Sequence, residues 1–360
     1  MRGYLVYLGK RIVVLTLTLI IATYLTVIIA NLGGALDELI KEEIRSQVIE
    51  NLMRGPQSSW FRQLPPEEQE RIIEERTQER IRALGLDAPF WQRSLIYLRD
   101  ALTLSLGRAR WIKSWSASSD VKIIIFERLP WSVLLFTTGT TISAAVGLTL
   151  GLYMGRKALS KFDRGMSMLA IVLSSLPAWF LGVLLILVFS FQLGWFPSGG
   201  RFSPRIHENV WDRTLDFLWH LSLPLASWVL TGFGSWAYVT RNLVIHILHE
   251  DYVMAARARG LPESLVMRRY VLRPAAPPII TMIALSIIGS WTGAIVTETV
   301  FQWDSMGVLY YEAITCAPGG DPPVIIGVTV MYAYLLVLTI FILDIIYALL
   351  DPRVRAGGGK

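Results

Sequence analysis

The sequence predicts an all-α membrane protein with six transmembrane helices, both termini in the cytoplasm and a helical insert outside the membrane. Only 17% of its 360 residues are charged and 53% are hydrophobic, whereas soluble domains carry roughly 25% charged residues. A helix needs about 20 apolar residues to cross a bilayer. Six uncharged runs reach or approach that length: Ile12 to Ala30, Leu129 to Gly155, Gly165 into the 190s, Phe217 to Thr240, Pro274 to Thr297 and Pro322 to Leu343.

The distribution of Lys and Arg gives the orientation. These residues gather near both termini and in the loops after the second and fourth runs, whereas the two short loops on the opposite side hold only Arg201, Arg205 and Arg213. Short loops rich in positive charge stay in the cytoplasm. Because this topology explains the net charge of +6, we expect the lipid bilayer to surround the runs, and we expect no nucleic-acid partner.

The first run follows a basic N-terminus, as the core of a secretory signal peptide does. Its apolar stretch is longer than a signal core, and no small-residue cleavage site follows it. We therefore interpret residues 1–32 as an uncleaved N-terminal transmembrane helix. At the other end, the topology places residues 351–360 in the cytoplasm as a tail.

Residues 33–128 predict an extracytoplasmic helical insert. Apolar residues recur at helical spacing over residues 36–52, and the Gly-Pro pair at 55–56 ends the pattern. A second helix is expected in "LPPEEQERIIEERTQERIRALG", with prolines and glutamates in its first turn and Gly85 past its end. A third should begin near Asp87, which is placed to cap it. The charges of the insert are typical of a solvated helix face, with contact to an extracytoplasmic partner as the alternative.

The residue types that carry catalysis or bind metals are sparse. A single cysteine, Cys316, forms no intrachain disulfide and no metal site by itself. No GxxxxGK[ST] motif occurs, so we expect the chain to bind no ATP by that route and to carry no cofactor. An intramembrane hydrolase needs a nucleophile with its base or paired aspartates, and Asp344 has no second carboxylate in the spans. A secondary transporter typically has an internal repeat and buried ion-coupling residues, which are not visible here.

A few polar residues and prolines lie in or beside the predicted spans. Charged residues at membrane depth are candidates for a functional role. Glu298 and Asp344, however, lie near the ends of runs, where pairing or helix-end hydrogen bonding is the simpler interpretation. His220 is interpreted as a satisfied interface histidine. Pro177 and Pro224 predict helix kinks, because each removes a backbone donor. We assign no substrate-binding residue.

Residues 249–274, "HEDYVMAARARGLPESLVMRRYVLRP", form a basic loop between two of the apolar runs. Helical spacing predicts that the helix of the fourth run continues through Arg259. Gly260 suits a helix C-cap, and Pro262 suits the first turn of the next helix. The expected product is a rigid bend that projects from the bundle, whose small residues permit close approach of another surface: Ala255, Ala256 and Ala258. The residues alone leave two interpretations open, a protein-docking surface and a lipid-anchoring loop whose arginines reach anionic headgroups.

The basic loop resembles the cytoplasmic EAA motif of permease subunits of ABC importers, in the form used by the oligopeptide/dipeptide/nickel family. Other stretches resemble the same family in the same order: "GLDAPFWQRSLIYL", "SLGRA", "ERLPWSVLLF", "SSLPAWFLGVLLILVFSFQLGWFPSGGR", "AIVTETVF" and "DIIYALLDPRVR". The resemblance covers nearly the whole chain except residues 36–82. Of the two permease subunits in such an importer, the chain resembles the first. It implies an ABC importer permease fold, with residues 129–350 as a five-helix permease core and residues 241–273 as the loop that couples to the ATPases.

The resemblance also implies partners and site residues. Such a subunit pairs with a second, homologous permease, two cytoplasmic ATPases bind the two coupling loops, and an extracytoplasmic binding protein delivers substrate. This chain is then no enzyme, and its partners bind and hydrolyse the ATP. By position, Ala255, Ala256 and Gly260 match the two alanines and the glycine of the motif. The local variant of the motif is matched by Asp251, Tyr252, Arg257 and Arg259.

The sequence departs from the family pattern at three places. Met254 stands where the wider superfamily has a glutamate, so a salt bridge from this position to the ATPase is not expected. Asp304 and Ser305 replace the usual Pro and Gly, which predicts a different outer turn after the fifth run. Leu104 and Ser105 replace the first half of a common Gly-Asp-Leu-Gly. The family imports mostly short peptides, which we expect here, with oligosaccharides or nickel chelates as alternatives.

Overall fold

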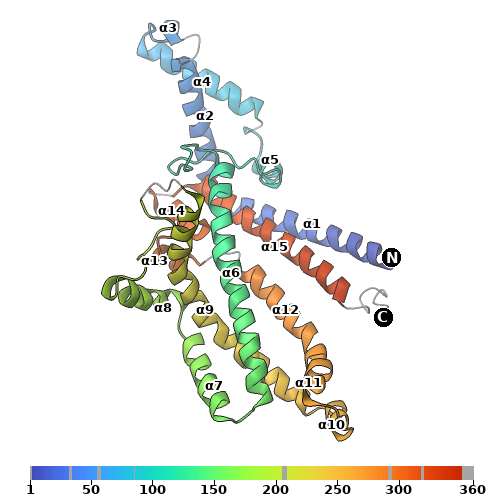
Figure 1. The fold of residues 1–360 in the computed structure, drawn as a ribbon. Coiled ribbons are helices and arrows are strands. Elements are labelled where there is room, and N and C mark those ends of the chain that lie inside the picture. Colours follow the sequence, from blue (N-terminus) through green and yellow to red (C-terminus); the bar gives the residue numbers. More distant parts are fainter. Residues whose placement is uncertain are drawn as a thin grey trace. The chain divides into compact units, whose positions relative to one another are not determined.

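The computed structural model describes residues 2–31, 35–54, 58–84, 86–204, 209–290, 294–317 and 320–350 (Figure 1). This part of the chain is helical almost throughout, and its extended pairing is one isolated bridge between Arg108 and Asp120. The predicted all-α fold class is therefore confirmed. The helix end predicted at residues 55–56, the cap at Gly85, Arg205 and the tail 351–360 lie outside the described residues.

Four helices within the described ranges are long and apolar enough to cross a membrane: Gly9–Ile29, Val121–Arg156, Glu263–Ile287 and Pro322–Ile345. A bent pair of helices adds a fifth if the pair counts as one span. The run from Phe217 to Thr240 lies within a long helix, but Trp, His, Ser and Gly residues interrupt its leucines and lower its hydropathy. Six spans and the cytoplasmic termini therefore stay predictions.

The chain divides into two compact units. The core unit comprises Met1–Arg11, Ile124–Glu312 and Leu338–Lys360, and the insert unit comprises Ile12–Ile123 and Ala313–Val337. The following helices build most of the core unit: α6 (Val121–Arg156), α7 (Lys161–Ser174), α8 (Ala178–Leu185), the π-helix η1 (Ile186–Gln192), α9 (Val210–Leu248), α10 (Asp251–Ala258), α11 (Glu263–Leu265), the π-helix η2 (Val266–Leu272), α12 (Arg273–Ser290), α13 (Ile295–Val300) and α14 (Met306–Thr315). Most of the insert unit is built from α1 (Arg2–Asn31), α2 (Ala35–Arg54), α3 (Ser58–Phe61), α4 (Pro66–Ala83), α5 (Phe90–Leu102) and α15 (Pro322–Leu350).

Helix α6 packs closely against α9 in the core unit, and the two run side by side in Figure 1. A Cβ atom added to Gly147 would lie 2.6 Å from the carbonyl oxygen of Phe233 and 2.9 Å from the backbone nitrogen of Ala237. Small residues allow such close approach of helices in membranes. They recur on α6 at every fourth position, which places them on one face: Gly139, Ser143, Gly147, Gly151 and Gly155.

The predicted third span is bent at Pro177, where the sequence predicted a kink, and its two halves are separate helices. Helices α7 and α8 meet at an angle of 97°, with Pro177 in an extended conformation at the N-cap of α8. The ring of Pro177 removes a backbone donor and disfavours helical geometry at the preceding residue. Ser175 helps to end α7, because its hydroxyl donates to the carbonyl of Ile171 at 2.7 Å. Pro224, by contrast, lies inside the continuous helix α9.

The fifth apolar helix begins earlier than the sequence indicated. The predicted span ran from Pro274 to Thr297, whereas the apolar helical stretch covers Glu263–Ile287 and α12 ends at Ser290. Two prolines lie inside α12, and the wider turn of η2 directly precedes it. The basic residues before Pro274 hid this start, because counting uncharged runs excludes any segment that contains arginines.

The insert unit has its own small core. Helices α2 and α4 follow the predicted segments, and they pack through Ile44, Val48 and Ile81, together with Leu86 from the turn after α4. Two features differ from expectation: α3 was not predicted, and Asp87 does not cap α5. The N-cap of α5 is Pro89, which makes no side-chain cap bond, and its fixed φ of −53° sets the start of the helix.

A buried carboxylate anchors the irregular segment 103–120 to the start of α15. Asp321 is fully buried, and its Oδ2 accepts hydrogen bonds from the backbone N–H groups of Arg110 at 2.9 Å, Trp111 at 2.9 Å and Ile112 at 3.3 Å. Leu104 in this segment has a φ of 54°, a left-handed conformation that favours glycine. This is the position where the family pattern has its first glycine.

Candidate functional site

The basic loop begins with a break between α9 and α10. Continuous helix through Arg259 was predicted, but α9 ends at Leu248 and Glu250 adopts an extended conformation before α10. The polar residues at the break satisfy backbone groups on both sides of it. The Nδ1 of His249 lies 2.7 Å from the carbonyl oxygen of Ile245, and the carbonyl of Glu250 accepts from the N–H of Val253 at 2.9 Å.

The turn between α10 and α11 follows the sequence prediction closely. Gly260 has a φ of 75°, in the left-handed region that ends helices and favours glycine. Its N–H donates to the carbonyl of Arg257 at 2.9 Å. Pro262 is the N-cap of α11, one position before the predicted first turn. Arg257 then closes the bend, because its guanidinium donates to the carboxylate of Glu263 at 2.8 and 3.3 Å.

A hydrophobic cluster holds this bend against the bundle. The buried residues come from the end of α9, from α10, from η2 and from the start of α12: Val244, Ile247, Val253, Ala256, Val266, Val271 and Ala275. Burial of a valine side chain contributes about 1.5–3 kcal/mol. One cluster therefore packs all four segments together.

The structure separates the predicted coupling residues into two groups. Ala256 is fully buried in the cluster, so it cannot form part of a docking surface without unfolding the bend. The other six are exposed: Asp251, Tyr252, Ala255, Arg257, Arg259 and Gly260. Met254 is exposed as well. Partial burial, together with the Glu250 carboxylate, raises the pKa of Tyr252.

Helix α7 is fixed to α9 close to the basic loop. Arg241 donates to both carboxylate oxygens of Asp163, at 2.7 Å for the Nη2–Oδ2 pair, and Asp163 is almost fully buried. Ser160 caps α7 by accepting from the N–H of Asp163 at 3.1 Å, and the N–H of Leu159 donates to Asp163 at 2.8 Å. The pair Arg241–Asp163 therefore joins α7 to α9 near the point where the basic loop begins.

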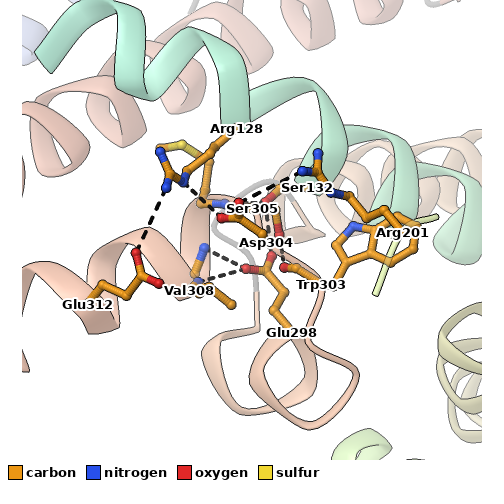
Figure 2. A network of polar contacts seen from close by, with 11 residues as sticks. Arg128, Ser132, Arg201, Glu298, Trp303, Asp304, Ser305, Val308 and Glu312 are labelled. Carbon is orange, nitrogen blue, oxygen red and sulfur yellow. Dashed lines mark hydrogen bonds and ion pairs between the residues drawn. The ribbon is translucent and has the colours of Figure 1, made fainter. Parts of the chain in front are cut away.

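A polar network occupies the segment after α13 and connects it to α6 and to the loop before α9 (Figure 2). Arg128 is buried and donates to Asp304 at 2.9 Å. The Oδ2 of Asp304 also lies 3.8 Å from the Nη2 of Arg201, and the Nη2 of Arg128 lies 3.9 Å from the Oε2 of Glu312. Burial raises the pKa of Glu312 and lowers that of Arg201. Asp304, one of the departures from the family pattern, thus balances two arginines.

Glu298 is fully buried beside this network. Its carboxylate accepts from the hydroxyl of Ser132 at 2.9 Å and from the N–H groups of Gly307 at 2.6 Å and Val308 at 3.0 Å. The hydroxyl of Ser132 in turn accepts from the N–H of Met306 at 2.9 Å. These bonds agree with the structural role expected for Glu298. Sequence reasoning missed Arg128 and Ser132, whose only signal was a charge followed by a hydroxyl in "ERLPWS".

The other suspected polar residues are also satisfied within the fold. His220 is buried, with its Nδ1 2.9 Å from the carbonyl oxygen of Asp216, and Asp344 pairs with Arg11. Cys316 is exposed and is a thiol rather than half of a disulfide, with its Sγ 3.9 Å from the carbonyl oxygen of Ala313. Among the described residues, no group of three or more His, Cys, Asp or Glu side chains is arranged to hold a metal ion.

Comparison with known proteins shows which family of proteins the chain resembles. The family model described as binding-protein-dependent transport system inner membrane component matches residues 147–356. An oligopeptide transport system permease protein, AppB, from Bacillus subtilis (strain 168) is 32% identical over 66% of this chain and 73% of its own length. A di/tripeptide transport system permease protein, DppB, from Pseudomonas aeruginosa (strain UCBPP-PA14) is 30% identical over 77% of this chain and 84% of its own length.

A solved structure supports the same fold. A chain of the MetNI methionine ABC transporter, in inward-facing conformations, matches 63% of this chain and 96% of its own length, with a TM-score of 0.50 and 16% sequence identity. At that identity the likeness concerns the fold alone. The family match covers more than half of the chain and extends over α9, the basic loop and α12. The chain therefore belongs to the family of inner membrane components of binding-protein-dependent transport systems.

Proposed function

We propose that this chain is one of two homologous permease subunits of an ATP-driven importer for di- and oligopeptides. In this proposal it forms half of the translocation pathway and crosses the cell membrane six times, with both termini in the cytoplasm. A binding protein delivers the peptide on the outer side. The names of the related permeases from B. subtilis and P. aeruginosa favour peptides over oligosaccharides or nickel chelates.

The bend of the basic loop carries the coupling part of the proposal. Six of the predicted coupling residues are exposed on α10 and the turn after it, whereas Val253 and Ala256 pack α10 against α9 and α12. A force applied to the exposed face therefore reaches the bundle without first unfolding a loop. ATP supplies this force through partner ATPases, which bind ATP in place of this chain. Alternating access follows if ATP binds the two states of the complex with different affinity.

The docking surface is tested by co-purification of the ATPases with the full complex. Ala255→Trp adds a large side chain on the exposed face of α10, and Ala158→Trp is the matched control, because Ala158 is exposed in a different loop on the predicted cytoplasmic side. We expect Ala255→Trp to lower the amount of bound ATPase at least tenfold and Ala158→Trp to leave it unchanged.

Two results would contradict the proposal. If both variants retain equal amounts of ATPase, α10 is not the surface on which the ATPase docks. If the unmodified chain retains no ATPase at all, the arginines of the basic loop serve as lipid anchors and secondary transport becomes the better hypothesis. The peptide proposal is tested separately by uptake of a labelled tripeptide, an oligosaccharide and a nickel chelate into proteoliposomes that hold the complex and its binding protein. Uptake of only the second or third would overturn it.

A further inference from the structure

A groove with an unusual lining lies in the core unit at the level of the predicted spans. It has a volume of about 470 Å³ and is bordered by α6, by the break between α7 and α8, by α9 and by α12. Seven of the thirteen residues that line it carry a hydroxyl group and none is charged. Ser174, Ser235 and Gly289 are exposed, so the groove opens on the surface of the isolated chain.

The hydroxyl groups that line this groove can still form hydrogen bonds with groups that enter it. Ser143 donates to its own helix at 2.7 Å, as do Thr231 at 2.9 Å and Ser290 at 2.7 Å. Because a hydroxyl oxygen keeps two acceptor lone pairs when its hydrogen is used, these three side chains still accept from N–H donors. Ser235 and Ser286 form no hydrogen bond with any described residue, so both can donate and accept.

Lipid does not suit such a surface. Hydrocarbon offers no partner for hydroxyl groups, and polar surface at membrane depth lies against protein or lines an aqueous cavity. Trp228 and Trp236 also line the groove, and the indole N–H of Trp228 donates to the hydroxyl of Thr140 at 3.2 Å. The indole nitrogen of Trp228 is thus used within the fold.

We infer that this groove is the contribution of the chain to the substrate passage, and that it takes short peptides through their main chains without selecting for side-chain charge. The inference rests on the proposed function. Main-chain N–H and C=O groups are common to all peptides and match hydroxyl acceptors and donors. A lining without charge neither attracts nor repels Lys or Glu side chains of the cargo. Charge selection, where the importer has any, then belongs to another component.

Thiol labelling tests where the passage lies. Cys316→Ser removes the one native thiol, and Ser235→Cys is then compared with Thr149→Cys, which is exposed on the part of α6 that faces away from the groove. Before labelling, Thr149→Cys should import trialanine at the rate of the parent, and import by each labelled variant is expressed relative to the rate of the same variant before labelling. After labelling with methanethiosulfonate ethyltrimethylammonium, we expect import by Ser235→Cys to fall at least tenfold and import by Thr149→Cys to stay unchanged.

A charge introduced at the same position tests the lack of selection. Ser235→Asp should lower import of triglutamate relative to trialanine at least tenfold, and Ser235→Lys should do the same to trilysine. Unchanged ratios, or full import by labelled Ser235→Cys in a complex whose parent imports trialanine, would overturn the inference and leave the proposed function standing. If the Cys316→Ser parent imports no peptide although it does import an oligosaccharide, the proposed function fails, and the inference fails with it.

Discussion

Replacing Gly151 by alanine should push α6 and α9 apart. A Cβ atom at this position would lie 2.5 Å from the carbonyl oxygen of Ala237 and 2.6 Å from the Cβ of Thr240. Comfortable carbon–oxygen contacts measure about 3.3–3.6 Å, so the separation is roughly 1 Å too small. Neither neighbour can rotate away, because one is backbone and the other is a Cβ atom. The helices must therefore shift, and their packing must loosen along the small-residue face.

The expected cost follows from the behaviour of overpacked interiors. Extra methylene groups in a well-packed core cost about 1–3 kcal/mol, which lowers the ratio of folded to unfolded protein roughly 5- to 140-fold. Equilibrium unfolding of the purified chain in mixed detergent, followed by tryptophan fluorescence, measures this ratio. Trp236 lies on the α9 side of the contact and should report the change.

Gly165→Ala is the matched control for this measurement. Gly165 also lies in a helix, but nothing is within 4 Å of an added Cβ. Alanine is the better helix former by about 1 kcal/mol, so this variant should be unchanged or slightly more stable. If Gly151→Ala unfolds at the same detergent fraction as Gly165→Ala, the close approach of α6 and α9 is wrong, and with it the packing that positions the groove.

Three further substitutions test other parts of the fold. Asp321→Asn leaves one amide group where three backbone N–H donors converge, so the insert unit should lose about 1–3 kcal/mol, seen as faster proteolysis within residues 103–120. Ala256→Leu should lose about 1–3 kcal/mol by overpacking, whereas the exposed Met254→Glu should stay within about 0.5 kcal/mol, both measured by detergent unfolding. Asp304→Asn should destabilise the chain, because it leaves the buried Arg128 close to a second arginine. A double-mutant cycle with Arg128→Met should recover part of that loss, and no recovery would mean that the two side chains do not interact.

Local sequence signals located the bend of the basic loop well. The Gly260 and Pro262 pair has strong backbone preferences of its own, which hold whatever surrounds it. The break at Glu250 was missed, because its cause is not local. The apolar spacing continues across it, and the chain turns there so that Val253 and Ala256 reach the cluster formed with α9 and α12.

The groove and the polar network likewise depend on contacts between segments that are far apart in the sequence. Every hydroxyl group of the groove is visible in the sequence, but α6, α9 and α12 lie far apart along the chain, and only their packing brings Ser143, Ser235 and Ser286 to one cavity. Likewise Asp304 was noticed as a departure from the family pattern, while its partners Arg128 and Arg201 are more than 100 positions away.

By itself, the sequence determined the all-α membrane class, the family and the position of the bend, because hydropathy, charge and the special backbones of Gly and Pro act within a few residues. Only the tertiary structure decided which residues of the bend face outward, how sharply α7 and α8 are bent, and which hydroxyl and charged groups meet. These outcomes depend on how closely helices approach, and contact distances between distant segments leave no periodic trace in a single sequence.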